Sequence, residues 1–107
     1  MLPDKVLLQL ERVGLPTGGE CPFVPEFVKN PKGELMVQKQ AVLYGPKKGK
    51  RGYVDKAGRI WVRDRAHAGL PDHWDVEEDG GRDYFRIDMQ GNRLATAKPD
   101  DASKPKS

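Results

Sequence analysis

Turn-forming residues cut this chain into short segments and so limit the folds open to it. The 107 residues include nine prolines and 12 glycines, and eight of these fall between residues 14 and 33. Proline removes a backbone N–H donor and glycine favours turns, so this density breaks long helices. The composition disfavours a helical bundle and predicts an irregular loop over residues 14–33, with at most one turn of helix near Pro25.

One short helix is expected before this loop. Apolar residues recur at helical spacing within residues 5–13, which is typical of a helix with one buried face. Asp4 is the predicted N-cap, and Gly14 is the predicted stop because glycine readily adopts the left-handed conformation that ends helices.

Beyond residue 34 the pattern becomes that of β-strands. Apolar and polar residues alternate over short stretches, and Gly, Pro and Asp bound these stretches. The expected strands are residues 34–44, 52–54, 59–64, 73–77 and 83–88. The predicted fold class is therefore α+β: a short N-terminal helix and irregular loop packed on a twisted antiparallel sheet of about five strands.

The length allows one small domain. It is expected over residues 1–97, with helix and loop in residues 1–33 and the sheet in residues 34–97. Residues 98–107 contain no large apolar residue and are predicted to form a disordered tail.

Alternation along the last three strands predicts two faces of the sheet. The predicted core face carries Ile60, Val62, Trp74, Val76, Phe85 and Ile87. The predicted open face carries Arg59, Trp61, Arg63, Arg65, His73, Asp75, Glu77, Tyr84, Arg86 and Asp88. An open face with this mixture of histidine, acids, arginines and aromatics is unusual for a surface that is merely solvated.

Charge is segregated along the chain, although the net charge is only +3. Residues 47–65 carry eight Lys or Arg against two Asp, and residues 66–88 carry seven acids against two arginines. A concentrated basic segment suits a phosphate-backbone partner. The predicted RNA-binding residues are Lys47, Lys48, Lys50, Arg51, Arg59 and Trp61, the last as a ring that stacks on a base. The alternative for Trp61 is a place in a second small core under the N-terminal loop. The alternative for the basic segment is a solvated face with no partner.

The two histidines lie close together in sequence, among acids and arginines. Cleaving RNA without a metal needs a base for the 2′-hydroxyl, an acid for the leaving 5′-oxygen, and a cation for the charge on phosphorus. Histidine and carboxylate suit the first two roles, and arginine suits the third. The candidates are Asp64 or Asp75 as base, His67 or His73 as acid, and Arg63 or Arg86 as phosphate clamp.

Other interpretations of this cluster stay open. His73 would then be a plain strand residue and Asp75 a cross-strand partner of Arg86, within a non-catalytic module that binds nucleic acid or protein. A divalent ion on His67, His73 and Asp75 would make a metal-dependent nuclease. The spacing matches no strong metal motif, and the single Cys21 allows no four-cysteine zinc site. No metal and no cofactor is therefore predicted.

Short motifs in the second half of the chain follow one another in a distinctive order. They are Gly49-Lys50-Arg51, Gly58-Arg59-Ile60-Trp61, Asp64-Arg65-Ala66-His67-Ala68-Gly69, Asp79-Gly80, Asp88-Met89-Gln90-Gly91-Asn92 and Pro99-Asp100. This order resembles the C-terminal ribonuclease domain of the ribosome-cleaving colicins and cloacin. It is also similar to the toxin domains at the C-termini of bacterial polymorphic and contact-dependent inhibition proteins.

The resemblance implies catalytic roles for Asp64 and His67, which stand where that family has its catalytic Asp and His. The family's catalytic glutamate would fall near Pro71, where this chain has none. The possible substitutes are Asp72, Asp75 and Glu77.

The resemblance also implies a ribosomal or transfer RNA substrate, a cognate acidic immunity protein, and a toxin that is monomeric when free. Such a toxin acts in the cytoplasm of a target bacterial cell. No transmembrane segment is expected, because the chain has no run of 18 apolar residues. No signal peptide is expected either, because the first apolar run, Val6-Leu7-Leu8, is short and Asp4 lies just before it.

Overall fold

The structure is a computed structural model that describes residues 4–66 and 69–94. His67 and the predicted tail, residues 98–107, lie outside the described residues. The elements are α1 (Asp4–Val13), β1 (Phe27–Lys29), β2 (Leu35–Val37), β3 (Lys39–Ala41), β4 (Arg51–Val54), β5 (Ile60–Asp64), β6 (His73–Glu78), the 3-10 turn η1 (Asp79–Gly81) and β7 (Asp83–Asp88). The predicted α+β class, with a short N-terminal helix and an antiparallel sheet, is confirmed.

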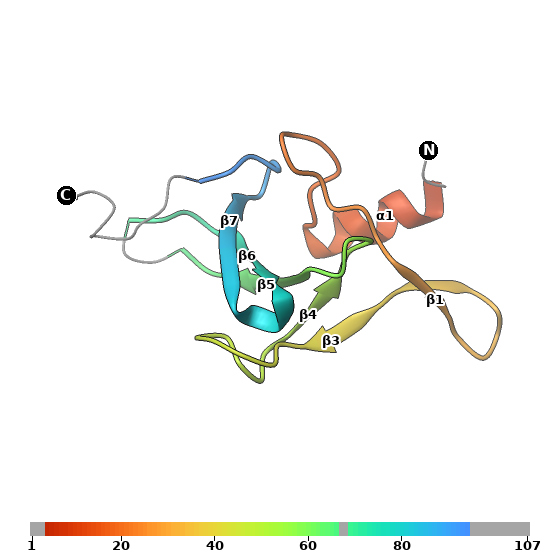
Figure 1. Cartoon of the computed structure of the whole chain (residues 1–107). Coiled ribbons are helices and arrows are strands. Elements are labelled where there is room, and N and C mark those ends of the chain that lie inside the picture. Colours follow the sequence, from red (N-terminus) through yellow and green to blue (C-terminus); the bar gives the residue numbers. More distant parts are fainter. Residues whose placement is uncertain (1–3, 67–68, 95–107) are drawn as a thin grey trace.

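The strands form two antiparallel sheets (Figure 1). The larger sheet has five strands in chain order, β3-β4-β5-β6-β7, and the smaller one is the ribbon β1-β2. The single strand expected over residues 34–44 is divided between the two sheets at Gln38. There the Gln38 N–H donates to the Glu26 carbonyl at 3.2 Å, while the Gln38 carbonyl accepts from Val54 at 2.8 Å.

The strand β1 corrects the expectation of a loop or helical turn around residues 25–29. Phe27 pairs with Val37, and the ladder supplies hydrogen bonds that an isolated turn would lack. Phe27 also packs against the main core, so tertiary contacts outweigh the local loop signals from the flanking prolines.

The helix α1 ends as the sequence predicts. Gly14 has φ +84°, its N–H donates to the Glu11 carbonyl, and the Leu15 N–H donates to the Leu10 carbonyl. These two bonds form a Schellman cap. Asp4 is the first residue of the helix rather than a cap before it, and a carboxylate there still favours the positive end of the helix dipole.

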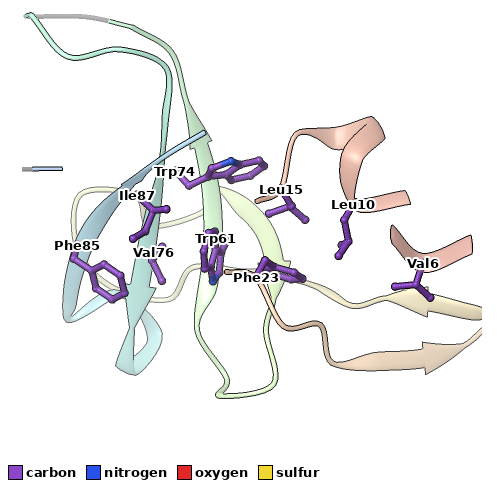
Figure 2. Packing of buried hydrophobic residues seen from close by; sticks show 9 residues of the cluster. All are labelled: Val6, Leu10, Leu15, Phe23, Trp61, Trp74, Val76, Phe85 and Ile87. Atoms are coloured by element: carbon purple, nitrogen blue, oxygen red, sulfur yellow. The ribbon is translucent and has the colours of Figure 1, made fainter. Parts of the chain in front are cut away.

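One face of the five-stranded sheet packs against α1 and the loop that follows it. Figure 2 shows the buried side chains of the sheet, the loop and the helix in a continuous row from β7 to α1: Phe85, Ile87, Val76, Trp61, Trp74, Phe23, Leu15, Leu10 and Val6. Phe23 meets Trp61 edge to face, with ring centroids 5.2 Å apart, and the Trp74 indole N–H donates to the Gly14 carbonyl. The loop is thereby fixed to the sheet at both tryptophans.

Trp61 belongs to this core and not to an exposed face, so its predicted role as a base-stacking ring is wrong. Its partner across the ladder is Val76, which places it on the same side as Trp74, and none of its surface is exposed. The indole N–H donates to a carboxylate oxygen of the buried Asp55 at 2.9 Å. Asp55 also accepts from the backbone of the β4–β5 turn and from the Arg59 side chain.

The opposite face of the sheet is also buried, which corrects two further expectations. Ile60 lies opposite Glu77, and Val62 lies opposite Asp75. These two aliphatic residues therefore share a face with the charged side chains, where they form a second core with Val42 and Val54. The face expected to be open is closed: His73, Asp75 and Glu77 are 0%, 2% and 0% exposed.

A segment between β3 and β4, residues 42–50, helps to cover this face; we call it the strap. The N–H groups of Leu43 and Tyr44 both donate to the Gly80 carbonyl in the turn between β6 and β7. The approach is close enough that a Cβ on Gly81, where φ is +112°, would collide with the Tyr44 carbonyl oxygen. Glycine at this position lets the strap bind the far end of the sheet.

Candidate functional site

A cavity of about 170 Å³ opens between the strap and strands β5, β6 and β7. Because side chains alternate along a strand, each of the three strands directs polar side chains toward this cavity. The strap contributes two further lining residues. The lining residues are Pro46, Lys47, Asp64, Asp75, Glu77, Tyr84 and Arg86.

The buried His73 ring lies beside two carboxylates at this cavity. Its Nε2 is 3.5 Å from an oxygen of Asp64, its cross-strand partner, and 3.5 Å from an oxygen of Asp75, two residues along β6. The other ring nitrogen, Nδ1, is 2.7 Å from the Pro71 carbonyl. A carbonyl can only accept a hydrogen bond, so Nδ1 carries a proton. Nε2 is consequently the nitrogen presented to the carboxylates.

Two cations neutralise this pair of carboxylates. The Lys47 ammonium is 3.1 Å from Asp64 and 3.2 Å from Asp75. Burial lowers the pKa of Lys47, but hydrogen bonds and attraction to these two carboxylates outweigh it and raise the pKa overall. Arg86 lies directly across from Asp75 on β7, with Nε 3.6 Å from Oδ1. The cross-strand pair expected under the non-catalytic interpretation is therefore present.

Glu77, which the sequence offers only as one of three possible substitutes for the family's catalytic glutamate, lines the same cavity. Its side chain is fully buried, and neither carboxylate oxygen has a hydrogen-bond partner among the described residues. Burial and repulsion from Asp75 raise the pKa of Glu77 to about 7, although attraction to Lys47 opposes the rise. Alternation along the strand predicts that Glu77 shares a face with His73 and Asp75. The sequence does not show that this face is buried, and the burial is what makes Glu77 a functional candidate.

The structure brings together Asp64, His73, Asp75, Arg86 and Lys47, whereas Arg63 lies elsewhere and His67 lies outside the described residues. Arg63 extends from the opposite face, where its guanidinium lies 5.7 Å from the Trp74 ring centroid and 3.3 Å from the exposed Asp72. Its predicted role as phosphate clamp at this cluster is wrong, because Arg63 and Asp64 point to opposite sides of β5.

The basic residues predicted to bind RNA divide into two groups. Lys48, Lys50 and Arg51 are exposed on the strap and at the start of β4. Arg59, in contrast, forms an ion pair with Asp55 at 2.8 Å and lies over the ring of Phe85 on the other face of the sheet. It is thus separated from the cavity by the sheet itself.

The same cluster has donors that suit a metal ion. One ligand atom each from Asp64, His73 and Asp75 lie within 4.8 Å of one another. A buried histidine beside carboxylates and cations can transfer protons and bind an anion. The histidine nitrogen and the two carboxylate oxygens of this cluster also suit a transition metal ion.

Comparisons with known proteins add no relative: no family model, no curated protein and no solved structure matches this chain. Over the described residues, no helix has the length and apolar character needed to cross a membrane.

Proposed function

We propose that this chain is a toxin-like ribonuclease domain that cleaves structured RNA without a metal ion. The supporting observation is the position of His73 Nε2, 3.5 Å from both Asp64 and Asp75, which line a cavity together with Lys47 and Arg86. Base, acid and cation are thus present within one site, which is the set that RNA transesterification needs.

In the proposed reaction, Asp64 accepts the proton of the 2′-hydroxyl. It is the more accessible of the two carboxylates, with 24% of its side chain exposed against 3% for Asp75. The 2′-oxygen then forms a bond to phosphorus, giving a 2′,3′-cyclic phosphate, and the bond to the 5′-oxygen breaks. His73 donates the proton that the departing 5′-oxygen takes up.

The cations have two tasks in this reaction. Arg86 and Lys47 stabilise the negative charge that grows on the phosphoryl oxygens. An entering phosphate also competes with Asp64 for the Lys47 ammonium, which leaves Asp64 better able to accept a proton. Asp75 stays paired with Arg86 and holds the His73 ring in place.

Lys48, Lys50 and Arg51 extend the positive surface beyond the cavity and position the RNA backbone. The resemblance to bacterial toxin domains supports the wider biological proposal. In it, the target is ribosomal or transfer RNA in the cytoplasm of a target bacterium, and an acidic immunity protein binds and neutralises the domain.

The test is cleavage of total bacterial RNA in excess chelator by the wild type and three variants. We expect cleavage by the wild type and a loss of about 10²-fold or more in rate for Asp64→Asn and His73→Gln. The matched control is Glu78→Gln, which removes a carboxyl from β6 on the opposite face and should cleave like the wild type.

Two results would contradict the proposal. RNA binding without cleavage would favour the non-catalytic binding module, and cleavage lost on chelation would favour a metal-dependent nuclease. Expression in a bacterial host adds a second test, because the wild type should arrest growth and the His73→Gln variant should not.

A further inference from the structure

We infer that Asp64, His73 and Asp75 form a binding site for a first-row transition metal ion such as Zn²⁺. In this inference the ion competes with the Lys47 ammonium, and its binding switches off the cleavage proposed above. The inhibitory part rests on the proposed function, whereas the metal site itself does not.

The spacing of the ligand atoms fits a tetrahedral ion. Zinc binds histidine nitrogen and carboxylate oxygen at about 2.0–2.2 Å, so neighbouring ligand atoms in a tetrahedron lie about 3.4 Å apart. His73 Nε2 is 3.5 Å from Asp64 Oδ2 and 3.5 Å from Asp75 Oδ1. Two edges of the required tetrahedron are therefore already built, and all three ligand atoms lie within 4.8 Å of one another.

The orientation of His73 is that of a metal ligand. Histidines that bind metals usually donate the second ring N–H to a carbonyl or carboxylate, which fixes the ring and its tautomer. His73 does this with Nδ1, 2.7 Å from the Pro71 carbonyl, and so directs Nε2 toward the carboxylates. The ring is fully buried, so this orientation costs no further ordering when an ion binds.

Glu77 provides an independent indication that the cavity accepts a cation. It lines the same cavity as Asp64 and Asp75, is fully buried, and has no hydrogen-bond partner for either oxygen among the described residues. A buried carboxyl without a partner is costly, and a cation nearby would offset that cost. Lys47 and Arg86, the two cations that line this cavity, supply two positive charges to its three acids, Asp64, Asp75 and Glu77.

Lys47 is the built-in competitor for this site. Its ammonium contacts both carboxylates that the ion needs, at 3.1 and 3.2 Å. With 24% of its side chain exposed, the ammonium has access to solvent when an ion displaces it. One imidazole and two carboxylates favour Zn²⁺ or Co²⁺ over Mg²⁺, which prefers oxygen ligands and retains its waters.

A bound ion would block the proposed reaction through three groups at once. It would take the Nε2 through which His73 donates its proton, engage the Asp64 carboxylate that accepts one, and displace the Lys47 ammonium. Zn²⁺ is accordingly expected to inhibit the intact domain reversibly.

The decisive experiment is a titration with Co²⁺, whose tetrahedral complexes absorb visible light strongly, using the full chain. We expect Lys47→Met to bind Co²⁺ about tenfold tighter than the wild type, or more tightly still. Asp64→Asn and His73→Gln should lose the tetrahedral spectrum, and Glu78→Gln should keep the wild-type affinity. Near-ultraviolet circular dichroism of the two buried tryptophans verifies that each variant is folded.

The metal site is refuted if the wild type shows no tetrahedral spectrum, if folded Asp64→Asn keeps it, or if Lys47→Met binds no tighter. The inhibitory part is tested by RNA cleavage with Zn²⁺, followed by chelator. Restored cleavage supports it, and cleavage that Zn²⁺ leaves unchanged or increases overturns it. If no RNA is cleaved under any condition, the proposed function fails, while the Co²⁺ titration still decides the metal site.

Discussion

Replacing Glu77 by glutamine should stabilise the protein in a way that depends strongly on pH. Glu77 is fully buried, and neither of its oxygens has a hydrogen-bond partner among the described residues. Its pKa rises from 4.5 to about 7 through burial and the neighbouring Asp75. Glutamine has nearly the same shape and no charge, so the substitution removes the titration and leaves the packing.

The sign and size of the effect follow from linkage between folding and protonation. Because the carboxyl holds its proton more tightly in the folded state, its contribution is fully favourable below pH 4.5 and is lost as the pH rises to about 7. A pKa rise of this size corresponds to about 3 kcal/mol. The wild type should therefore become less stable than Glu77→Gln by about that amount between pH 4.5 and pH 8.

Urea unfolding of both proteins at pH 4.5, 6 and 8, in chelator-treated buffer, measures this difference. Titratable groups distant from Glu77 cancel in this comparison, so the difference reports Glu77 and its electrostatic coupling to Asp75 and Lys47. The control Glu78→Gln, on the opposite face of β6, should change stability by less than about 0.5 kcal/mol at each pH. A stability difference for Glu77→Gln that stays constant from pH 4.5 to 8 would refute this view of a buried, unpaired carboxyl.

Two further substitutions test the contacts that shape the site. Gly81→Ala should destabilise the protein by about 3 kcal/mol in urea unfolding, because its Cβ would meet the Tyr44 carbonyl at a φ of +112°. Gly49→Ala, with φ +89° and open space around it, should cost only about 1 kcal/mol; equal losses would argue against the strap contact. Asp55→Ala should cost about 3 kcal/mol, since it leaves the Trp61 N–H without its acceptor. An unchanged unfolding midpoint for this variant would contradict that role.

Local patterns predicted most of the elements correctly. Helical spacing before Gly14 corresponds to α1, and alternation over residues 59–64, 73–77 and 83–88 corresponds closely to β5, β6 and β7. These signals are local because a helix face or a strand face is repeated every few residues. The prediction failed at β1, where the flanking prolines and glycine indicate a loop although β1 forms a short hairpin with β2, with Lys29 paired to Leu35 and Phe27 to Val37.

The main error of the sequence prediction concerned which face of β5 packs against the helix. Alternation in β5 separates Ile60 and Val62 from Trp61, but both sets are apolar, so the pattern does not say which set faces the helix. Only the register, in which Trp61 meets Val76, decides this. A sheet buried on both sides removes the contrast between apolar and polar faces on which such predictions depend.

The composition of the site was partly predictable for a related reason. The acids and histidine of β6 and Arg86 of β7 lie on adjacent strands, and alternation places them on one face. Lys47 was predicted to meet RNA from a basic surface, yet it faces Asp64, which lies 17 residues away in sequence. That contact depends on the strap reaching Gly80, a long-range interaction that no local pattern encodes.

RNA cleavage in excess chelator tests the central claim most directly, with the wild type, Asp64→Asn, His73→Gln and Glu78→Gln compared at equal concentration. The predicted result is cleavage to 2′,3′-cyclic phosphate ends by the wild type and Glu78→Gln, with the other two variants slower by about 10²-fold or more. Full cleavage by folded His73→Gln, or no cleavage by the wild type, would contradict the claim that the His73–carboxylate cluster is a ribonuclease site.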